Sequence, residues 1–298
     1  MSRFANCGQI WHLCTPGNKT ELLFVNPEDY AFCVSSIGVC AHLYGVEILA
    51  DIVMSNHIHI IARSEIASLL SFFDGLKKKL QKYFKKNGRT VCMSGFDCGE
   101  PIQITSLDML RTEIVYVARN AYVARNDVLP HTYPWGSCYL LFNHIVGEIQ
   151  FKRFNDLPYR EKRRILLSRV IELPDNYVVS KGMIHPVSYC HFEEVEGYFR
   201  NAHHYFSMLT RNYEAYSQEA IRLGDSQVLT DEEMYYAVCE VCSKQYNTKS
   251  PGNLALKDKS DVAKVMHSDY NATNGQIQRI LRMDINFVNS LFPSTAKR

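Results

Sequence analysis

Two histidines in the segment MSNHIHII have the spacing best suited to chemistry. The sequence HIHIIAR predicts a β-strand, on which successive side chains alternate between the two faces of the sheet. His57 and His59 would therefore point to one face, while Ile58 and Ile60 point into the opposite layer. Two neutral imidazoles at this spacing can bind one divalent metal ion, although an arbitrary His-x-His pair is as often a pair without a metal.

A second group of chemically useful residues lies on a predicted helix over residues 106–124, which begins at a Thr105-x-x-Asp108 capping box. Tyr116 and Asn120 are four residues apart, so they share a face of that helix. A divalent ion bound by two histidines and one amide oxygen would keep coordination positions for water and for phosphate oxygens. Taken alone, one of eighteen tyrosines is more often a core residue than a nucleophile.

Strand and helix signals alternate up to about residue 146 and predict the elements that would hold these residues. Asn26 and Pro27 form a helix start, and Gly45 is a suitable end for that helix. A tight turn at Ser55-Asn56 joins two strands as an antiparallel hairpin, and a long amphipathic helix follows it. The predicted strands have the sequences QIWHLC, ELLFV, VEILADIVM and HIHIIAR. This pattern predicts an α+β fold, in which helices pack on an antiparallel sheet.

The chain divides into three predicted regions: residues 1–146, a basic and mostly helical middle region over 147–225, and a helical C-terminal region over 226–298. Hydrophobic residues make up 46% and charged residues 21%, a balance that is typical of a globular protein and argues against global disorder. The first residues lack the apolar stretch of a signal peptide, and no apolar run is long enough to span a bilayer. We therefore expect a cytoplasmic protein with reduced thiols and no membrane partner.

The two motif regions resemble the signatures of one enzyme family. MSNHIHII resembles the M-P-N-H-hydrophobic-H signature of the HUH single-tyrosine transposases. YVARNAYVARNDVLPHTYPWGS resembles the second signature of the REP-associated tyrosine transposases, Y-I-x-x-N-P-V-R-A-G-hydrophobic-V followed by Y-P-W-S-S. The resemblance covers roughly residues 9–142, with both blocks in the family's order. It departs at Ala121, at Tyr122-Val123 and at Gly136, where the family has Pro, Val-Arg and Ser.

This resemblance implies a fold, a reaction and a set of functional residues. The fold would be the HUH nuclease fold, a ferredoxin-like antiparallel sheet with packed helices, followed here by a mostly α-helical C-terminal region. His57, His59 and Asn120 match the residues that bind a divalent metal, Mg²⁺ or Mn²⁺, and Tyr116 matches the nucleophile. Tyr116 would attack a phosphodiester of single-stranded DNA, in a hairpin or palindromic repeat, and leave a 5′-phosphotyrosine and a free 3′-OH for rejoining. The sequence specifies neither the DNA target nor the oligomeric state.

Positive charge is concentrated in two runs, although the formal net charge of +2 argues for no partner by itself. One run lies on and after the long amphipathic helix, and the other lies in the middle region. Each run is either a solvated face or a surface that contacts the DNA backbone. With Arg119 of the second motif block, the residues that we expect to contact DNA are Lys77, Lys78, Lys82, Lys85, Lys86, Arg89, Arg163 and Arg164.

The last block of the chain predicts three short helices with a helix-turn-helix pattern, since Thr273-x-x-Gln276 forms a capping box and Arg282-Met283 forms a turn. An ordinary helical mini-domain fits this block nearly as well. Two other functions compete with the transposase. One is a domesticated DNA-binding protein without catalysis on the same fold, and the other is an unrelated metal-dependent hydrolase whose activity would survive Tyr116→Phe.

Overall fold

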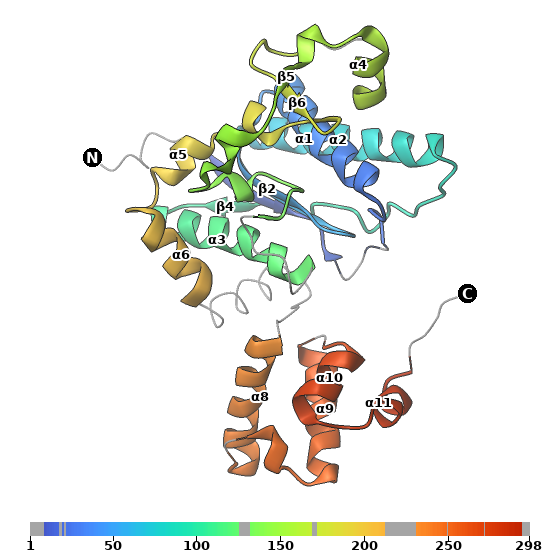
Figure 1. Ribbon diagram of the computed structural model, residues 1–298, viewed down its shortest axis with the longest axis vertical. Helices are drawn as coiled ribbons and strands as arrows, with labels where there is room; N and C mark the ends of the chain where they lie inside the picture. The colour runs from blue at the N-terminus through green and yellow to red at the C-terminus, as the bar shows by residue number, and fades with distance from the viewer. Residues whose placement is uncertain are drawn as a thin grey trace. The chain divides into compact units, whose positions relative to one another are not determined.

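A four-stranded antiparallel sheet forms the centre of the first of two compact units, which span Met1–Asn212 and Tyr213–Arg298. The computed structural model describes residues 9–17, 20, 22–124, 132–168, 172–211, 231–248, 250–270 and 272–293. The strand order is β2-β3-β1-β4, and every neighbouring pair is antiparallel (Figure 1). The strands are β1 (Ile10–Cys14), β2 (Glu47–Val53), β3 (Ile58–Arg63) and β4 (Ile102–Ile104). The predicted α+β class is confirmed. The predicted antiparallel hairpin is also confirmed and is formed by β2 and β3.

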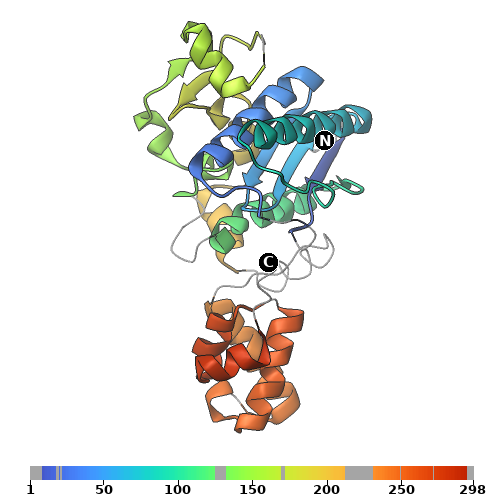
Figure 2. The same cartoon turned by 90° about the vertical axis from the view of Figure 1, so that its right-hand side faces the viewer.

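The alternation of side chains along β3 gives the sheet two different faces, as predicted. Ile58 and Ile60 are fully buried in an apolar core with α1 (Pro27–Tyr44) and α2 (Ile66–Lys86). His59 is paired with Cys14 of β1 and belongs to the other face, which α3 (Leu107–Ala124) covers. Figures 1 and 2 show the sheet between α1 and α2 on one side and α3 on the other.

Local sequence signals set the ends of the long helices. The side chain of Asn26 accepts a hydrogen bond from Asp29 N at 2.9 Å, and Pro27 is the first residue of α1. Gly45 ends that helix with a φ of 65°, in the left-handed conformation that glycine adopts at the least cost. The start and end predicted for this helix are therefore confirmed.

Two local predictions differ from the structure. Ser106 caps α3 by accepting a hydrogen bond from Met109 N at 3.1 Å, one residue after the cap that the sequence predicts. The segment ELLFV is not a strand in the part of it that the structure describes. Leu23 N and Phe24 N both donate to Ser55 O, at 2.9 and 2.8 Å. These amides therefore bind the turn between β2 and β3, and not a neighbouring strand.

The middle of the chain packs over α1 and contains a three-stranded sheet, whereas its sequence predicts mostly helices. Ile184 N donates to Ser35 Oγ of α1, and Tyr177 OH donates to Gly38 O, both at 3.0 Å. A Cβ atom at Gly38 would lie 2.4 Å from the ring of Tyr189. Small residues on the outer face of α1 therefore allow the middle region to pack closely against it. For this reason α1 is buried on nearly all sides. The strands and helices between residues 138 and 211 are β5 (Lys152–Arg153), α4 (Tyr159–Leu166), β6 (Val178–Ser180), β7 (Met183–Ile184), α5 (Phe192–Glu196) and α6 (Ala202–Arg211), with short 3-10 turns η4 (Cys138–Leu140), η5 (His144–Glu148), η6 (Phe154–Asp156) and η7 (Pro186–Ser188).

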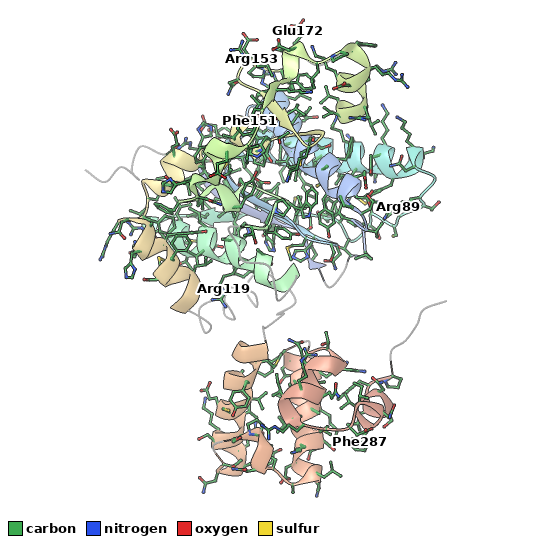
Figure 3. All side chains as sticks on the ribbon, viewed as in Figure 1. Arg89, Arg119, Phe151, Arg153, Glu172 and Phe287 are labelled. Carbon is green, nitrogen blue, oxygen red and sulfur yellow. The ribbon has the colours of Figure 1, made fainter. Side chains whose placement is uncertain are left out.

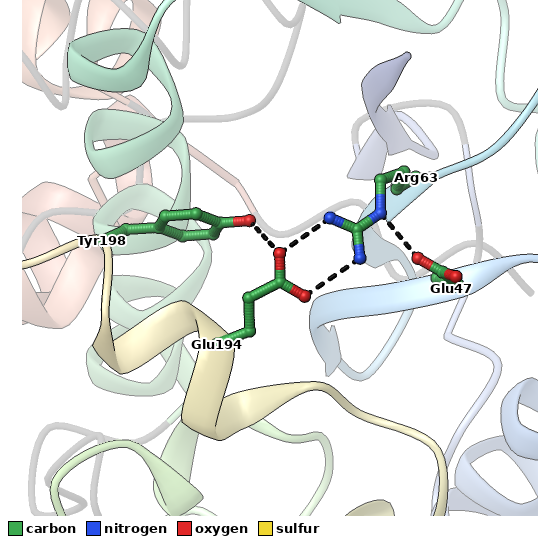
Figure 4. A network of polar contacts seen from close by, with 4 residues as sticks. All are labelled: Glu47, Arg63, Glu194 and Tyr198. Carbon is green, nitrogen blue, oxygen red and sulfur yellow. Dashed lines mark hydrogen bonds and ion pairs between the residues drawn. The ribbon is translucent and has the colours of Figure 1, made fainter. Parts of the chain in front are cut away.

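A network of charged side chains fastens α5 to the end of the central sheet (Figure 4). The guanidinium of Arg63, the last residue of β3, donates to both carboxylate oxygens of Glu194 at 2.7 and 2.9 Å. The same guanidinium donates to Glu47 of β2 at 2.6 Å, and Tyr198 OH donates to Glu194 at 2.6 Å. A bidentate arginine–carboxylate pair fixes direction as well as distance, so it orients α5 on the sheet.

Asp51 of β2 is a fully buried carboxyl group on the face of the sheet that α1 covers. Burial raises the pKa of Asp51 to about 7, and hydrogen bonds with Ser137 and Tyr189 only partly oppose that effect. The folded protein therefore holds a proton that the unfolded chain releases at a lower pH. As a result, the free energy of unfolding falls as the pH rises between about 4 and 7.

Asp51→Asn should remove this loss of stability. A shift of about three pKa units corresponds to ~4 kcal/mol, so above pH 7 the variant should be the more stable protein by up to that order. Urea unfolding of both proteins at pH 5 and pH 8 measures the difference, and the exposed Asp74→Asn serves as the control. If the free energies of unfolding of Asp51→Asn and wild type differed by the same amount at both pH values, the prediction would be contradicted.

The second unit is a group of short helices around its own apolar core, in which Val262, Ile277 and Val288 are buried. The predicted capping box between Thr273 and Gln276 is present, and Arg282 ends the same helix in the left-handed conformation. The elements of this unit are α8 (Asp231–Tyr246), η8 (Pro251–Asn253), α9 (Leu256–Asp269), α10 (Asn274–Leu281) and α11 (Ile285–Leu291). Throughout the part of the chain that the structure describes, no helix combines the length and the apolar character that crossing a membrane requires.

Candidate active site

The two histidines of the MSNHIHII segment lie together on the face of the sheet that α3 covers. His57 immediately precedes β3, and His59 lies within it, flanked by β1 and β2. Their ring centroids are 5.0 Å apart, with the planes nearly perpendicular. His57 is 6% exposed and His59 is fully buried, so both rings belong to the interior of the first unit.

Helix α3 brings Tyr116 directly against this pair. The rings of Tyr116 and His59 are 5.4 Å apart, and the tyrosine is 2% exposed. Asn120 lies one helical turn further on, is equally buried, and donates from Nδ2 to Tyr116 O at 3.0 Å. The structure therefore unites the tyrosine with the histidines, whereas the hydrogen bond that it describes for Asn120 goes to the helix itself.

Two further residues of the cluster, His12 and Glu113, were not among those that the sequence predicts. His12 of β1 contacts the Glu113 carboxylate through Nδ1 at 2.7 Å and His59 Nδ1 through Nε2 at 3.2 Å. Its ring is also 6.0 Å from that of Tyr116. One sequence signal could have identified Glu113, because it is a charged residue directly before the apolar stretch IVYVA and lies three residues before Tyr116.

The donor set around the two histidines fits a divalent cation. The Nδ1 atom of His57 contacts Asn56 at 2.8 Å and that of His59 contacts His12, so Nε2 is the nitrogen through which each ring would bind a metal. Among the described residues, no three His, Cys, Asp or Glu side chains are grouped so as to hold a metal ion. Asn120, which matches the third ligand in the family resemblance, would add an amide oxygen, and phosphate or water oxygens would complete the shell.

The segment YPWGS of the second motif block lies along the edge of β2 that faces away from β3. Val53 N donates to Trp135 O at 2.8 Å, and Ser137 N donates to Asp51 O at 2.9 Å. Between these bonds, Gly136 has a φ of 149°, and a Cβ atom there would lie 2.3 Å from Asp51 O. The departure from serine at this position therefore has a structural reason, since only glycine has both the conformation and the space.

Two of the arginines predicted to contact DNA, Arg89 and Arg119, make hydrogen bonds within the first unit; both are labelled in Figure 3. Arg119 on α3 is 5% exposed and donates to Leu209 O of α6 at 2.8 Å. Arg89 donates to Asp29 and to Leu23 O, both at 2.6 Å, and stacks on a phenylalanine ring. Arg119 is buried and bonded to α6, so it would have to become accessible before it could contact DNA. Its neighbour Arg125 lies outside the described residues.

The lysines of α2 lie on the opposite side of the sheet from Tyr116, because the apolar stripe of α2 packs on the face that Ile58 and Ile60 form. Lys77 is half-buried, while Lys78, Lys82, Lys85 and Lys86 are exposed. A cavity of about 870 Å³ lies between α2 and α4, where the two basic runs of the sequence meet. Its charged lining residues are Lys82, Lys86, Arg160, Glu161, Arg163 and Arg164.

No protein-family model matches this sequence, and neither the curated proteins nor the solved structures contain a match to it.

Proposed function

We propose that this chain is a metal-dependent single-stranded DNA transposase of the HUH type, with Tyr116 as its nucleophile. The observation that carries the proposal is the packing of the Tyr116 ring 5.4 Å from that of His59, which is itself 5.0 Å from that of His57. A phenol and two imidazoles thus meet on one face of an antiparallel sheet. The resemblance of the first motif block to the HUH single-tyrosine transposases, and of the second to the REP-associated tyrosine transposases, also supports the proposal.

In the proposed reaction, the phenol of Tyr116 loses its proton and Oη forms a bond to the phosphorus of a DNA phosphodiester. The bond from phosphorus to the 3′ oxygen breaks, and that oxygen takes up a proton. The products are a 5′-phosphotyrosine and a free 3′-OH, so the phosphodiester energy is kept for rejoining to another 3′-OH. Because an ordinary phenol has a pKa of about 10, it is a weak nucleophile at neutral pH. A divalent ion held by His57, His59 and Asn120 would supply polarisation of the phosphate and neutralisation of the developing charge.

The near-complete burial of Tyr116 favours a second candidate function. A tyrosine that is 2% exposed has to become accessible before a phosphodiester can reach Oη. The same burial suits a core residue of a DNA-binding protein that does not cleave DNA. The two functions differ in one measurable product, the covalent protein–DNA adduct.

Covalent capture of labelled hairpin oligonucleotides tests the proposal. The protein is incubated with single-stranded hairpins from its genomic neighbourhood, in Mn²⁺ or in EDTA, and resolved on a denaturing gel. A labelled protein band in Mn²⁺ that is absent in EDTA is expected. Tight hairpin binding without cleavage would favour the DNA-binding protein, and cleavage without an adduct would favour a hydrolase.

The cavity between α2 and α4 is lined by Lys82, Lys86, Arg160, Arg163 and Arg164 with one acid, Glu161, and belongs to the proposed DNA surface. Arg163→Glu should weaken hairpin binding about tenfold at 0.1 M salt, because a phosphate contact is lost and a repulsive charge is added. The slope of log K against log salt should fall by about one. Fluorescence anisotropy across a salt series measures both quantities.

Arg200→Glu is the matched control, because it makes the same charge change at an exposed arginine that does not line the cavity. If both variants weakened hairpin binding equally, binding would depend only on the net charge of the protein. Such a result would remove the cavity from the proposed DNA surface.

A further inference from the structure

A buried chain of hydrogen-bonding groups runs from Glu113 through His12 to His59. The side chains of His12 and Glu113 are 0% and 1% exposed, and their Nδ1 and Oε2 atoms are 2.7 Å apart. On the other side of the His12 ring, Nε2 lies 3.2 Å from Nδ1 of His59. The three residues come from α3, β1 and β3, so the packing of α3 on the sheet sets the geometry of the whole chain.

The chemistry of these groups assigns a direction to the hydrogen bonds. A carboxylate only accepts, so Nδ1 of His12 carries the hydrogen that faces Glu113. In a neutral His12 ring, Nε2 is then an acceptor, and Nδ1–H of His59 donates to it. The lone pair of His59 is thereby placed on Nε2, which is the form of imidazole that binds a metal.

His57 is oriented in the same sense by a different residue. Nδ2 of Asn56 donates to Gly17 O at 2.7 Å and to Thr20 O at 3.3 Å, so the amide presents its oxygen to the histidine. That oxygen lies 2.8 Å from Nδ1 of His57 and accepts its hydrogen. The lone pair of His57 is therefore also on Nε2, and two independent sets of contacts lead to the same tautomer in both histidines.

We propose that Glu113 and His12, together with Asn56, are positioning residues that hold His59 and His57 as Nδ1–H tautomers, with Nε2 of each directed at one divalent cation. This inference rests on the proposed function, because it assigns a role to neighbours of the proposed metal ligands. Glu113 and His12 act through His59 and do not touch the DNA or the cation. The carboxylate–histidine–histidine chain also explains why a charged residue is tolerated in the buried middle of α3.

Two measurements test the proposal, and the first requires no metal. Two-bond ¹H–¹⁵N correlation spectra of the metal-free protein report which ring nitrogen carries the hydrogen. His57 and His59 should both be Nδ1–H tautomers in the wild-type protein. In Glu113→Gln, the amide can donate to Nδ1 of His12 and reverse the chain, so the His59 signal should move toward the Nε2–H tautomer while that of His57 stays. An Nε2–H form of His59 in wild type would overturn the proposal.

The second measurement is the affinity for Mn²⁺, obtained by calorimetry or by electron paramagnetic resonance of free Mn²⁺. Glu113→Gln and Asn56→Ala should each weaken binding about tenfold or more. Glu113→Asp should retain more affinity than Glu113→Gln, since it keeps the carboxylate. Glu194→Gln, which loses an ion pair elsewhere in the first unit, is the control for a general loss of stability.

The possible results separate this inference from the proposed function. Unchanged Mn²⁺ affinity in Glu113→Gln, beside a loss in His59→Ala, would overturn the positioning role and leave the metal site intact. No Mn²⁺ binding by the wild-type protein would overturn the metal site, and with it both the positioning role and the proposed mechanism.

Discussion

Replacing Tyr116 by phenylalanine should abolish the covalent protein–DNA adduct, with adduct formation falling by roughly 10³-fold or more. The substitution removes only Oη, the atom proposed to attack phosphorus. The ring that packs against His59 and His12 stays in place, so the fold and the surroundings of the two histidines should persist. The measurement is the yield of labelled protein band per hour with a hairpin oligonucleotide in Mn²⁺.

Tyr177→Phe provides the matched control for this experiment. Tyr177 is another buried tyrosine, and its OH donates to Gly38 O on the opposite side of the sheet, so its replacement costs a hydrogen bond but no proposed chemistry. We expect this variant to form the adduct at close to the wild-type yield. An adduct that persists in Tyr116→Phe would assign the nucleophile to another residue, and hydrolysis that persists without an adduct would replace the transposase by a hydrolase.

Gly136→Ser should destabilise the first unit by about 3 kcal/mol or more. This change restores the residue of the family signature, yet the structure leaves no place for it. The φ of 149° is strained for any residue with a Cβ atom, and that atom would meet the backbone of Asp51 at 2.3 Å and that of Ile52 at 2.7 Å. Backbone atoms of a sheet strand cannot turn aside as a flexible side chain can.

Gly45→Ala separates the two causes of that loss. Gly45 also has a positive φ, but nothing lies within 4 Å of a Cβ atom built there, so the expected loss is only about 1 kcal/mol. Both tryptophans of the chain, Trp11 and Trp135, belong to the first unit, so tryptophan fluorescence in urea reports on that unit alone. If the two substitutions lowered the free energy of unfolding equally, the edge of β2 would have moved to accommodate a side chain at Gly136.

Much of the fold around the sheet could be predicted, because the signals that define it are local. Asn26, Pro27 and Gly45 set the ends of α1, and the alternation around Ile58 and Ile60 assigns each face of β3. The second sheet could not be predicted in the same way. Its strands are only two or three residues long, which is too short for a pattern of alternation to appear.

The candidate site could be predicted only as far as its motifs extend. Spacing and resemblance predict functional roles for His57, His59 and Tyr116, and the structure brings these three residues together. His12 and Glu113 were missed because their roles depend on contacts between residues that are distant in the sequence. The side of the sheet on which the α2 lysines lie could not be predicted either, since it depends on which face the apolar stripe of that helix covers.

The order of the strands has a consequence for the synthesis of the protein. β1 is translated first but lies between β3 and β4, so its hydrogen-bond partners on both sides are made later. His12 meets His59 47 residues further along the chain, and Glu113 101 residues further along. In a nascent chain, the cluster of His12, His59 and Glu113 therefore cannot form until α3 has left the ribosome. Under the proposed function, the chain cannot cut DNA before its first unit has folded.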